Sequence, residues 1–331
     1  MTFQNLKEIN NMLNPGYKTH NISVSIQHWQ LRDMLKIHEN NLIFAQGDKI
    51  CGYDPDTKES SIFTENLGFY PTSLCCDHGY LAVGGQKSQL CIVELQSKKT
   101  FSTNLQGSIN NAVQIYNHNG ELRLMVCNND HTIKVINLSN NENICNISHP
   151  FPVNNCQISN DGKLLASVGD TNDVYLYAIE DNNYRLIHNF KLINDGGFKV
   201  TWNTTSNLFS VATQDGYICV YDVRNLEKIH VIPTKQTPGL KGACRTVMFN
   251  RKRSLDILFY TEHMSSFGII DTRTFSKRQT VLLSQADRDT QISGAVFSEC
   301  NERIFVAVDD KILEYTINTP SRRVSSDYSI N

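Results

Sequence analysis

The chain has 331 residues, and its 31 Lys and Arg nearly balance its 33 Asp and Glu. That balance argues against a nucleic-acid binder held by phosphate contacts, because such a surface needs a strong excess of positive charge. No apolar run approaches the roughly 18 residues of a membrane span, and no signal-peptide pattern is present. We therefore expect no membrane contact and a location in the cytoplasm or also in the nucleus.

The N-terminal part of the chain holds two features that bear on the fold. We expect residues 1–18 to be flexible, as chain ends commonly are. Residues 22–26, ISVSI, alternate apolar and polar side chains, which is typical of a strand. Trp29, in the segment HWQLR, is interpreted as a large buried anchor beside that strand.

A short apolar pattern recurs seven times along the rest of the chain. Its copies start at residues 50, 90, 133, 174, 218, 267 and 312, as in ICGYD at 50–54 and ICVYD at 218–222. The copies lie roughly 44 residues apart, which fits a four-stranded propeller blade and no helical repeat of about 33 or 34 residues. Each copy is therefore predicted to be one strand of a blade.

The segments around each copy supply the other strands. Residues 160–163, NDGK, and 214–216, QDG, are strong hairpin signals between neighbouring strands. Seven copies of four strands predict an all-β fold, a seven-bladed WD40-type β-propeller, because stacked blades bury the faces that one sheet leaves exposed. We expect a flexible N-terminus at 1–18, the propeller at 19–318 and a flexible tail at 319–331.

The ring of blades must close, since an open end would leave an unpaired sheet edge. The last copy ends near residue 317, so its blade lacks a fourth strand. We predict that residues 22–26 supply this outer strand of the seventh blade. Trp29 is then expected to anchor the closure.

Two of the copies resemble WD40 repeats. Residues 213–222, TQDGYICVYD, look like the second and third strands of that family with Tyr in place of Trp, and residues 129–135, NDHTIKV, match as well. The Trp-Asp dipeptide is absent, so the resemblance is to a divergent member. It implies that Asp130 and Asp215 have a structural role in turns, where Asp side chains bond nearby backbone amides.

A narrower resemblance rests on HWQLRD at 28–33 and GACRTVMF at 242–249, with DILFYTEH at 256–263 and IDTRTF at 270–275. These segments are similar to a group of fungal WD-repeat proteins. Some of that group are substrate receptors of the GID (CTLH) ubiquitin ligase and read protein N-termini. The resemblance implies protein partners, namely a peptide or protein N-terminus and ubiquitin-ligase subunits.

No motif for catalysis or metal binding stands out. The sequence lacks G-x-S-x-G, a P-loop and H-E-x-x-H, so we expect no catalytic residue and no cofactor. Cys75, Cys76 and His78 form the nearest Cys–His grouping and are interpreted as strand thiols beside a turn histidine. The ten cysteines are expected to be free, mostly buried thiols, with no metal bound.

The upper face of a propeller consists of the loops that enter each first strand and the turns between second and third strands. On that face we predict a peptide-binding set of Asn111, Asn155, Lys199, Arg245, Glu262, His263 and Asp309. Acidic groups in the turns could pair with an N-terminal ammonium through charge-assisted hydrogen bonds. Simple solvation of the loops is the alternative, and Arg245 with Glu262 is the pair expected to matter most.

Three other functions remain open at this point. The chain could be a general scaffold subunit of another complex, or an enzyme with a site at the channel mouth, because fold alone does not decide function. A phosphoinositide-binding propeller would need an Arg-Arg pair in a late blade. The only adjacent arginines, Arg322 and Arg323, lie in the polar tail, which disfavours that function.

Overall fold

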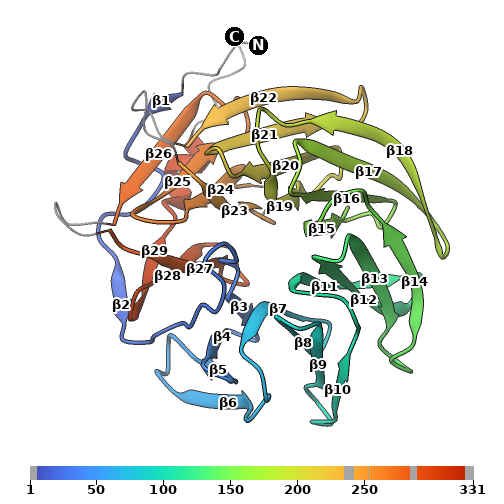
Figure 1. Ribbon diagram of the computed structural model, residues 1–331. Helices are drawn as coiled ribbons and strands as arrows, with labels where there is room; N and C mark the ends of the chain where they lie inside the picture. Colours follow the sequence, from blue (N-terminus) through green and yellow to red (C-terminus); the bar gives the residue numbers. More distant parts are fainter. Residues whose placement is uncertain (1–5, 235–241, 253, 284–288, 325–331) are drawn as a thin grey trace.

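Seven antiparallel sheets surround a central axis in the computed structural model (Figure 1). The structure describes residues 6–324 except 235–241, 253 and 284–288. In that part of the chain one short helix, α1 (Thr319–Val324), accompanies the strands. The predicted seven-bladed β-propeller is therefore confirmed.

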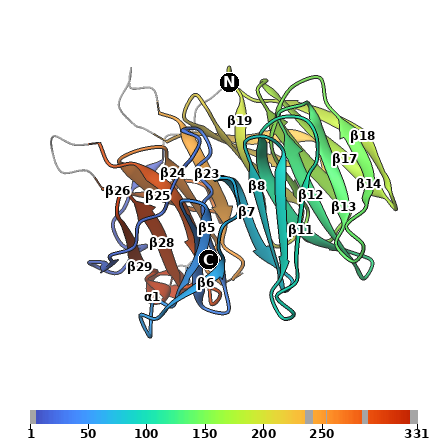
Figure 2. The same ribbon diagram turned by 60° about the horizontal axis from the view of Figure 1, so that its bottom comes forward.

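Each blade is a meander whose first strand lies nearest the axis, and Figure 2 shows the strands of neighbouring blades crossing the thickness of the ring. The first three blades are β3 (Leu35–His38), β4 (Asn41–Gln46), β5 (Lys49–Tyr53), β6 (Ser60–Thr64); β7 (Pro71–Asp77), β8 (Tyr80–Gly85), β9 (Gln89–Glu94), β10 (Thr100–Asn104); and β11 (Asn110–His118), β12 (Glu121–Asn128), β13 (Thr132–Asn137), β14 (Asn143–Ser148).

The remaining four blades follow in chain order around the ring. They are β15 (Val153–Ile158), β16 (Leu164–Gly169), β17 (Asp173–Glu180), β18 (Asn183–Lys191); β19 (Gly197–Trp202), β20 (Leu208–Thr213), β21 (Tyr217–Asp222), β22 (Glu227–Pro233); β23 (Cys244–Phe249), β24 (Ile257–Glu262), β25 (Ser266–Asp271), β26 (Lys277–Leu282); and β27 (Ile292–Phe297), β28 (Arg303–Val308), β29 (Lys311–Thr316), completed by β2 (Lys18–His20).

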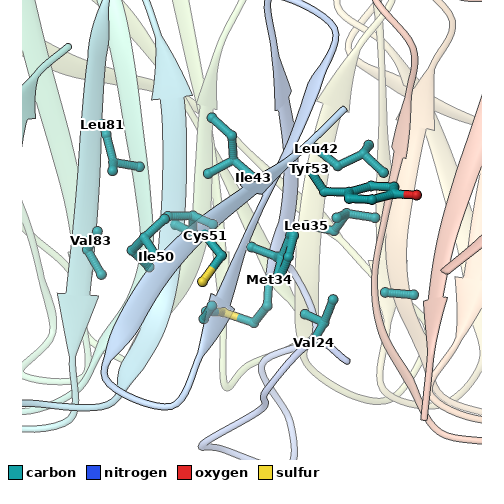
Figure 3. Close-up of a cluster of buried hydrophobic side chains, with 14 of the residues drawn as sticks. Val24, Met34, Leu35, Leu42, Ile43, Ile50, Cys51, Tyr53, Leu81 and Val83 are labelled. Carbon is teal, nitrogen blue, oxygen red and sulfur yellow. The ribbon is translucent and has the colours of Figure 1, made fainter. Parts of the chain in front are cut away.

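The recurring pattern forms the third strand of every blade, namely β5, β9, β13, β17, β21, β25 and β29. These strands are apolar because both of their faces are covered by neighbouring blades. Figure 3 shows one such interface, where Ile50 on β5 belongs to a cluster that also holds Leu81 and Val83 on β8. The two predicted hairpins also form, since 160–163 joins β15 to β16 and 214–216 joins β20 to β21.

An N-terminal strand closes the ring, but it is not the predicted one. β2 pairs antiparallel with β29, with Lys18 opposite Glu314 and His20 opposite Ile312 (Figure 1). Residues 22–26 form no strand; Val24 is buried in the first-blade core, and Ser25 N–H donates to Ala45 O at 2.8 Å. An alternating pattern marks an extended segment with one buried face, and such a segment need not pair with a sheet edge.

A buried ionic cluster holds the closing strand. His20 Nε2 lies 3.0 Å from Glu314 Oε2, and His20 Nδ1 lies 3.2 Å from Tyr53 Oη on the first blade. Lys18 Nζ and Arg303 Nη1 also approach Glu314 Oε1, at 3.2 and 3.6 Å. The side chain of Glu314 is only 1% exposed, so its charge is compensated inside the protein.

Both ends of the described chain pack against the ring, which differs from the flexible ends expected. β1 (Lys7–Glu8) adds a fifth, parallel strand to the sixth blade beside β26 (Figure 1). Met12 is buried, and in α1 the buried Arg322 donates to both carboxylate oxygens of Asp271, at 3.1 and 3.0 Å. Arg322 is thus committed to an internal ion pair. Residues 1–5 and 325–331 lie outside the described part.

The turn residues Asp130 and Asp215 make local hydrogen bonds. Asp130 Oδ1 accepts hydrogen bonds from Thr132 N and Thr132 Oγ1 at 3.1 and 2.6 Å, and Asp215 Oδ1 accepts one from Thr213 Oγ1 at 2.5 Å. These contacts are local, because Asp side chains favour bonds to residues within the same turn.

The buried His149, which follows β14, contacts two strands of the fourth blade. His149 Nε2 lies 2.8 Å from Ser167 Oγ on β16 and 3.1 Å from Tyr177 Oη on β17. Burial lowers the pKa of His149 to about 4, from an ordinary value of 6.5. The folded protein therefore keeps this imidazole neutral at pH values where the unfolded chain protonates it.

Replacing His149 is expected to flatten the dependence of stability on pH. Between the unfolded pKa of 6.5 and the folded pKa of about 4, acid favours the unfolded chain, which binds the extra proton. The loss of unfolding free energy over that range is about 3 kcal/mol. Urea titrations at several pH values should show this slope in the wild type and much less of it in His149→Gln. His188→Gln, on β18, is the control, and an unchanged slope in His149→Gln would contradict the assignment.

Replacing Glu314 is expected to weaken ring closure. Glu314→Ala leaves the buried His20 without its carboxylate, whereas Arg303 keeps its contact with Asp56 and Lys18 is exposed. The loss at His20 should lower the unfolding free energy by about 3 kcal/mol. Glu180→Ala removes a carboxylate that is 52% exposed, and it should change stability by less than about 1 kcal/mol. Equal effects of both changes on urea unfolding would refute the role given to the buried cluster.

Candidate binding site at the mouth of the central channel

The first strands of all seven blades line a central channel with a cavity of about 420 Å³. Above it, where the chain enters five of these strands, lies a pocket of about 20 Å³ that we call the mouth. Its lining includes the polar side chains of Thr72, Ser73, Asn111, Asn154 and Asn155. The mouth is narrow enough to admit one small chemical group.

β-bulges place one side chain per blade at this level. In six first strands the register shifts at the second residue, so that this residue has no partner on the second strand. These bulged residues are Thr72, Asn111, Asn154, Phe198, Arg245 and Ser293. The first five of them line the mouth. Each of these five blades thus contributes one side chain at the same level, and that side chain can differ from blade to blade.

The segment 28–33 lies across the mouth before the chain enters the first blade. It contacts three other blades: Trp29 lies 5.7 Å from the guanidinium of Arg245, Arg32 Nη1 donates to Gln291 Oε1 at 3.4 Å, and Asp33 pairs with Lys199. Its exit is fixed by Met34 N–H, which donates to Ser293 O at 3.2 Å. The segment is therefore part of the site.

Arg245 is the most unusual residue of the mouth. It is 4% exposed, and its guanidinium carbon lies 4.0 Å from the ring centre of Phe198. Its Nε and Nη1 atoms are buried and form no hydrogen bond with the described residues. Burial, and to a smaller extent the charge of Arg32, lowers the pKa of Arg245 to about 10, so the group stays positively charged at neutral pH.

A second buried arginine stands beside it. Arg32 is 7% exposed, and its Nε donates to Trp29 O at 2.8 Å. Burial lowers the pKa of Arg32. Burial, followed by the charges of Arg245 and Arg32, also lowers the pKa of His28. Within the described residues neither arginine forms a salt bridge, and Glu262 and Asp195 act on Arg245 without such a contact. The mouth therefore holds two positive charges with no carboxylate in direct contact.

The other charged side chains that line the mouth, Asp33 and Lys199, are paired. Asp33 Oδ1 accepts from Lys36 Nζ at 2.5 Å, and Asp33 Oδ2 accepts from Lys199 Nζ. Burial alone would raise the pKa of Asp33, but Lys199 and Lys36 outweigh it and hold that pKa below its usual value. Lys199, which was predicted to bind a peptide, is therefore engaged within the channel.

The structure separates the predicted peptide-binding set into two groups. Asn111, Asn155, Lys199 and Arg245 line the mouth together. The two asparagines also join blades, since Asn111 Nδ2 donates to Val153 O at 2.9 Å and Val200 N–H donates to Asn155 Oδ1 at 3.0 Å.

The other three predicted residues lie away from the mouth. His263 and Asp309 follow the second strands β24 and β28, and Asp309 Oδ1 accepts from Gln291 N–H at 3.0 Å. Glu262 is fully buried, where it accepts hydrogen bonds from Ala243 N–H at 2.8 Å and from Thr234 Oγ1. Glu262 acts electrostatically on Arg245 but does not line the mouth, so the role expected for this pair in peptide binding stays a prediction.

One further sequence-based interpretation needs correction. Trp29 is not a buried anchor, because 61% of it is exposed. Trp202 is the buried one, at 5%, and its Nε1 donates to Gln157 O at 2.9 Å. Phe198 and Arg32 were not among the predicted residues; aligning the blades at the second residue of each first strand would have singled out Phe198.

Three further properties of the described residues concern metal binding, cysteines and membrane spans. They contain no group of three or more His, Cys, Asp or Glu that could hold a metal ion. All ten cysteines are free, and six of them are buried. In the same residues no helix has the length and apolar character to cross a membrane.

The chain is similar to several known proteins. A family model described as an uncharacterised protein domain (DUF2415) matches residues 242–282, the sixth blade with Arg245. The uncharacterized protein C4G3.03 of Schizosaccharomyces pombe is 28% identical over 328 residues, 95% of this chain and 94% of that protein. The uncharacterized protein YLR149C of Saccharomyces cerevisiae is 24% identical over 233 residues, 58% of this chain and 32% of that protein.

A solved structure supports the architecture. A chain of the mitotic checkpoint complex superposes with a TM-score of 0.75 at 15% identity, covering 94% of both chains. At this identity the likeness concerns the fold alone. The chain is a seven-bladed β-propeller, and this neighbour shares that overall fold.

Removing the charge of Arg245 is expected to stabilise the protein. Arg245→Met keeps a long side chain against Phe198 and removes a buried charge without a carboxylate partner, so unfolding free energy should rise by about 1 to 2 kcal/mol. Arg185→Met, at a position 58% exposed, is the control and should change little. A clear loss of stability in Arg245→Met, measured by urea unfolding, would show that the charge has a partner in solution.

Proposed function

We propose that the chain is a non-catalytic protein-interaction module that binds a peptide at the mouth. We further propose that it is a substrate (N-degron) receptor of a GID-type ubiquitin ligase. The observation that carries the first proposal is the exposed Trp29 beside the buried, unpaired Arg245. Aromatic and arginine side chains at the centre of a pocket are the groups that dominate protein interfaces.

The chemistry of the mouth favours binding over catalysis. Among the described residues that line it, Asp33 is the only carboxylate, and histidine and cysteine are absent. Asp33 is held by two lysines, which lower its pKa. A general base needs a pKa near the working pH, and the two lysines hold the pKa of Asp33 below even its usual acidic value.

Two exposed carboxylates suit a peptide N-terminus. Asp170 follows β16 and accepts from Asn154 Nδ2 at 2.8 Å; Asp195 precedes β19 and accepts from Gly196 N–H at 2.7 Å. Asp170 acts electrostatically on His28 and Asp195 on Arg245, so both lie at the rim of the mouth. An N-terminal ammonium there would gain charge-assisted hydrogen bonds.

The receptor role rests on the resemblance of residues 28–33 and 242–275 to the fungal receptor group. These two segments are also the ones that meet at the mouth, through Trp29, Arg32 and Arg245. A group-specific sequence located at a binding site supports a shared ligand class.

Reporter degradation tests both parts of the proposal. A library of random N-termini fused to a fluorescent protein is expressed with or without the chain, and some N-termini should lower the signal only when the chain is present. Trp29→Ala should weaken this effect at least about 10-fold, because it removes exposed contact area at the mouth. Leu282→Ala, at an outer position 77% exposed, should behave as wild type.

Different outcomes would overturn different parts. If no N-terminus responds and purified chain binds none of the library peptides, the peptide-binding proposal fails. If peptides bind with Trp29 dependence but reporter levels do not depend on GID ligase subunits, the ligase assignment fails and the binding module remains.

A further inference from the structure

We propose that Arg245 and Arg32 form a subsite for one carboxylate of the bound peptide, so that the protein selects ligands with an Asp or Glu side chain close to their N-terminus. This inference rests on the proposed peptide-binding function and deepens it. It follows from the position, the burial and the missing partners of the two arginines.

The position is specific to one blade. Of the six bulged side chains, five are neutral and Arg245 alone is charged. Its neighbour in the ring is Phe198, whose ring centre lies 4.0 Å from the guanidinium carbon. Stacking on Phe198 holds the plane of the guanidinium in place, and the rigid planar fork of an arginine then presents its N–H groups edge-on.

Because Arg245 is buried, the lack of a carboxylate partner destabilises the folded protein. Transfer of a charge from water to a protein interior destabilises the fold unless hydrogen bonds and an opposite charge compensate it. Arg245 is 4% exposed, and its Nε and Nη1 have no acceptor in the described residues. Stacking on an aromatic face does not satisfy these in-plane donors, so they lack an acceptor in the described residues. A carboxylate held in the mouth, which Arg245 lines, would supply one.

Arg32 strengthens the same preference. Its hydrogen bonds to Trp29 O and Gln291 Oε1 go to neutral acceptors, so its charge is also uncompensated. The two positive charges also repel each other, which adds to the larger effect of burial in lowering the pKa of Arg245. An anion between them relieves that repulsion and supplies the missing acceptors.

The size and surroundings of the mouth favour a single carboxylate. The pocket holds about 20 Å³, which is close to the space of one water molecule and suits a flat carboxylate edge. The exposed carboxylates Asp170 and Asp195 lie nearby and disfavour a doubly charged phosphate. The peptide's ammonium would then lie at Asp170 and Asp195, and its acidic side chain at Arg245 and Arg32.

Small anions test the subsite without any peptide. The chain has two tryptophans, and Trp202 is buried, so fluorescence changes on ligand addition report mainly on Trp29. Sodium acetate, compared with sodium chloride at equal ionic strength, should give a saturable change. Arg245→Gln should weaken it at least 10-fold, while Arg251→Gln, beyond the opposite end of β23, should leave it intact.

Each other result overturns the assignment. Equal responses to acetate and chloride, or an acetate response that survives Arg245→Gln, would show that no carboxylate subsite exists there. Inorganic phosphate that binds at least 10-fold tighter than acetate would replace the carboxylate by a phosphorylated side chain. Thermal unfolding of each variant confirms that the loss of response is not a loss of fold.

A peptide selection separates this inference from the proposed function. Random peptides with free N-termini are selected on wild type, where one position near the N-terminus should be enriched in Asp and Glu. Selection on Arg245→Gln should keep the dependence on a free N-terminus and lose the acidic preference. Selected peptides without that preference would defeat the carboxylate subsite alone, whereas a failure to select any peptide that competes at Trp29 would defeat the binding function itself.

Discussion

Packing between neighbouring blades is the interaction on which the whole structure depends. A four-stranded sheet with two apolar faces is not stable alone, so each blade is stabilised by the blades on either side. The third strands show this directly, since every residue of β25 is buried. Such a ring is stable only if it closes, and closure here is achieved by β2 with the buried cluster of His20 and Glu314.

The repeated bulge also determines which side chains line the mouth. Because a bulge falls at the second residue of six first strands, each of these blades directs one side chain toward the axis without disturbing the core behind it. The chemistry of the mouth therefore depends on single residues rather than on the packing of the ring. Phe198 and Arg245 make two adjacent blades different from the small polar residues of the others.

The sequence was sufficient for the blades because the third strands carry a strong apolar pattern with a regular period. It was not sufficient for the closing strand: in β2, Lys18 is exposed and His20 is buried against Glu314, which lies nearly three hundred residues away in the sequence. The mouth was only partly predictable. Loop position identified Arg245 and the asparagines, but the exposure of Trp29 and the burial of Glu262 follow from where segment 28–33 and the sixth blade meet.

The unpaired arginines make physical sense in a ring of this kind. A small domain with a marginal core would tolerate such charges poorly, whereas a propeller distributes its stability over seven interfaces and loses little through one unfavourable position. Sites that bind ligands commonly retain groups that are unfavourable until the ligand arrives. Since the guanidinium of Arg245 is already stacked and desolvated, an incoming carboxylate meets a preorganised donor, and the charge that destabilises the free protein becomes a source of selectivity in the complex.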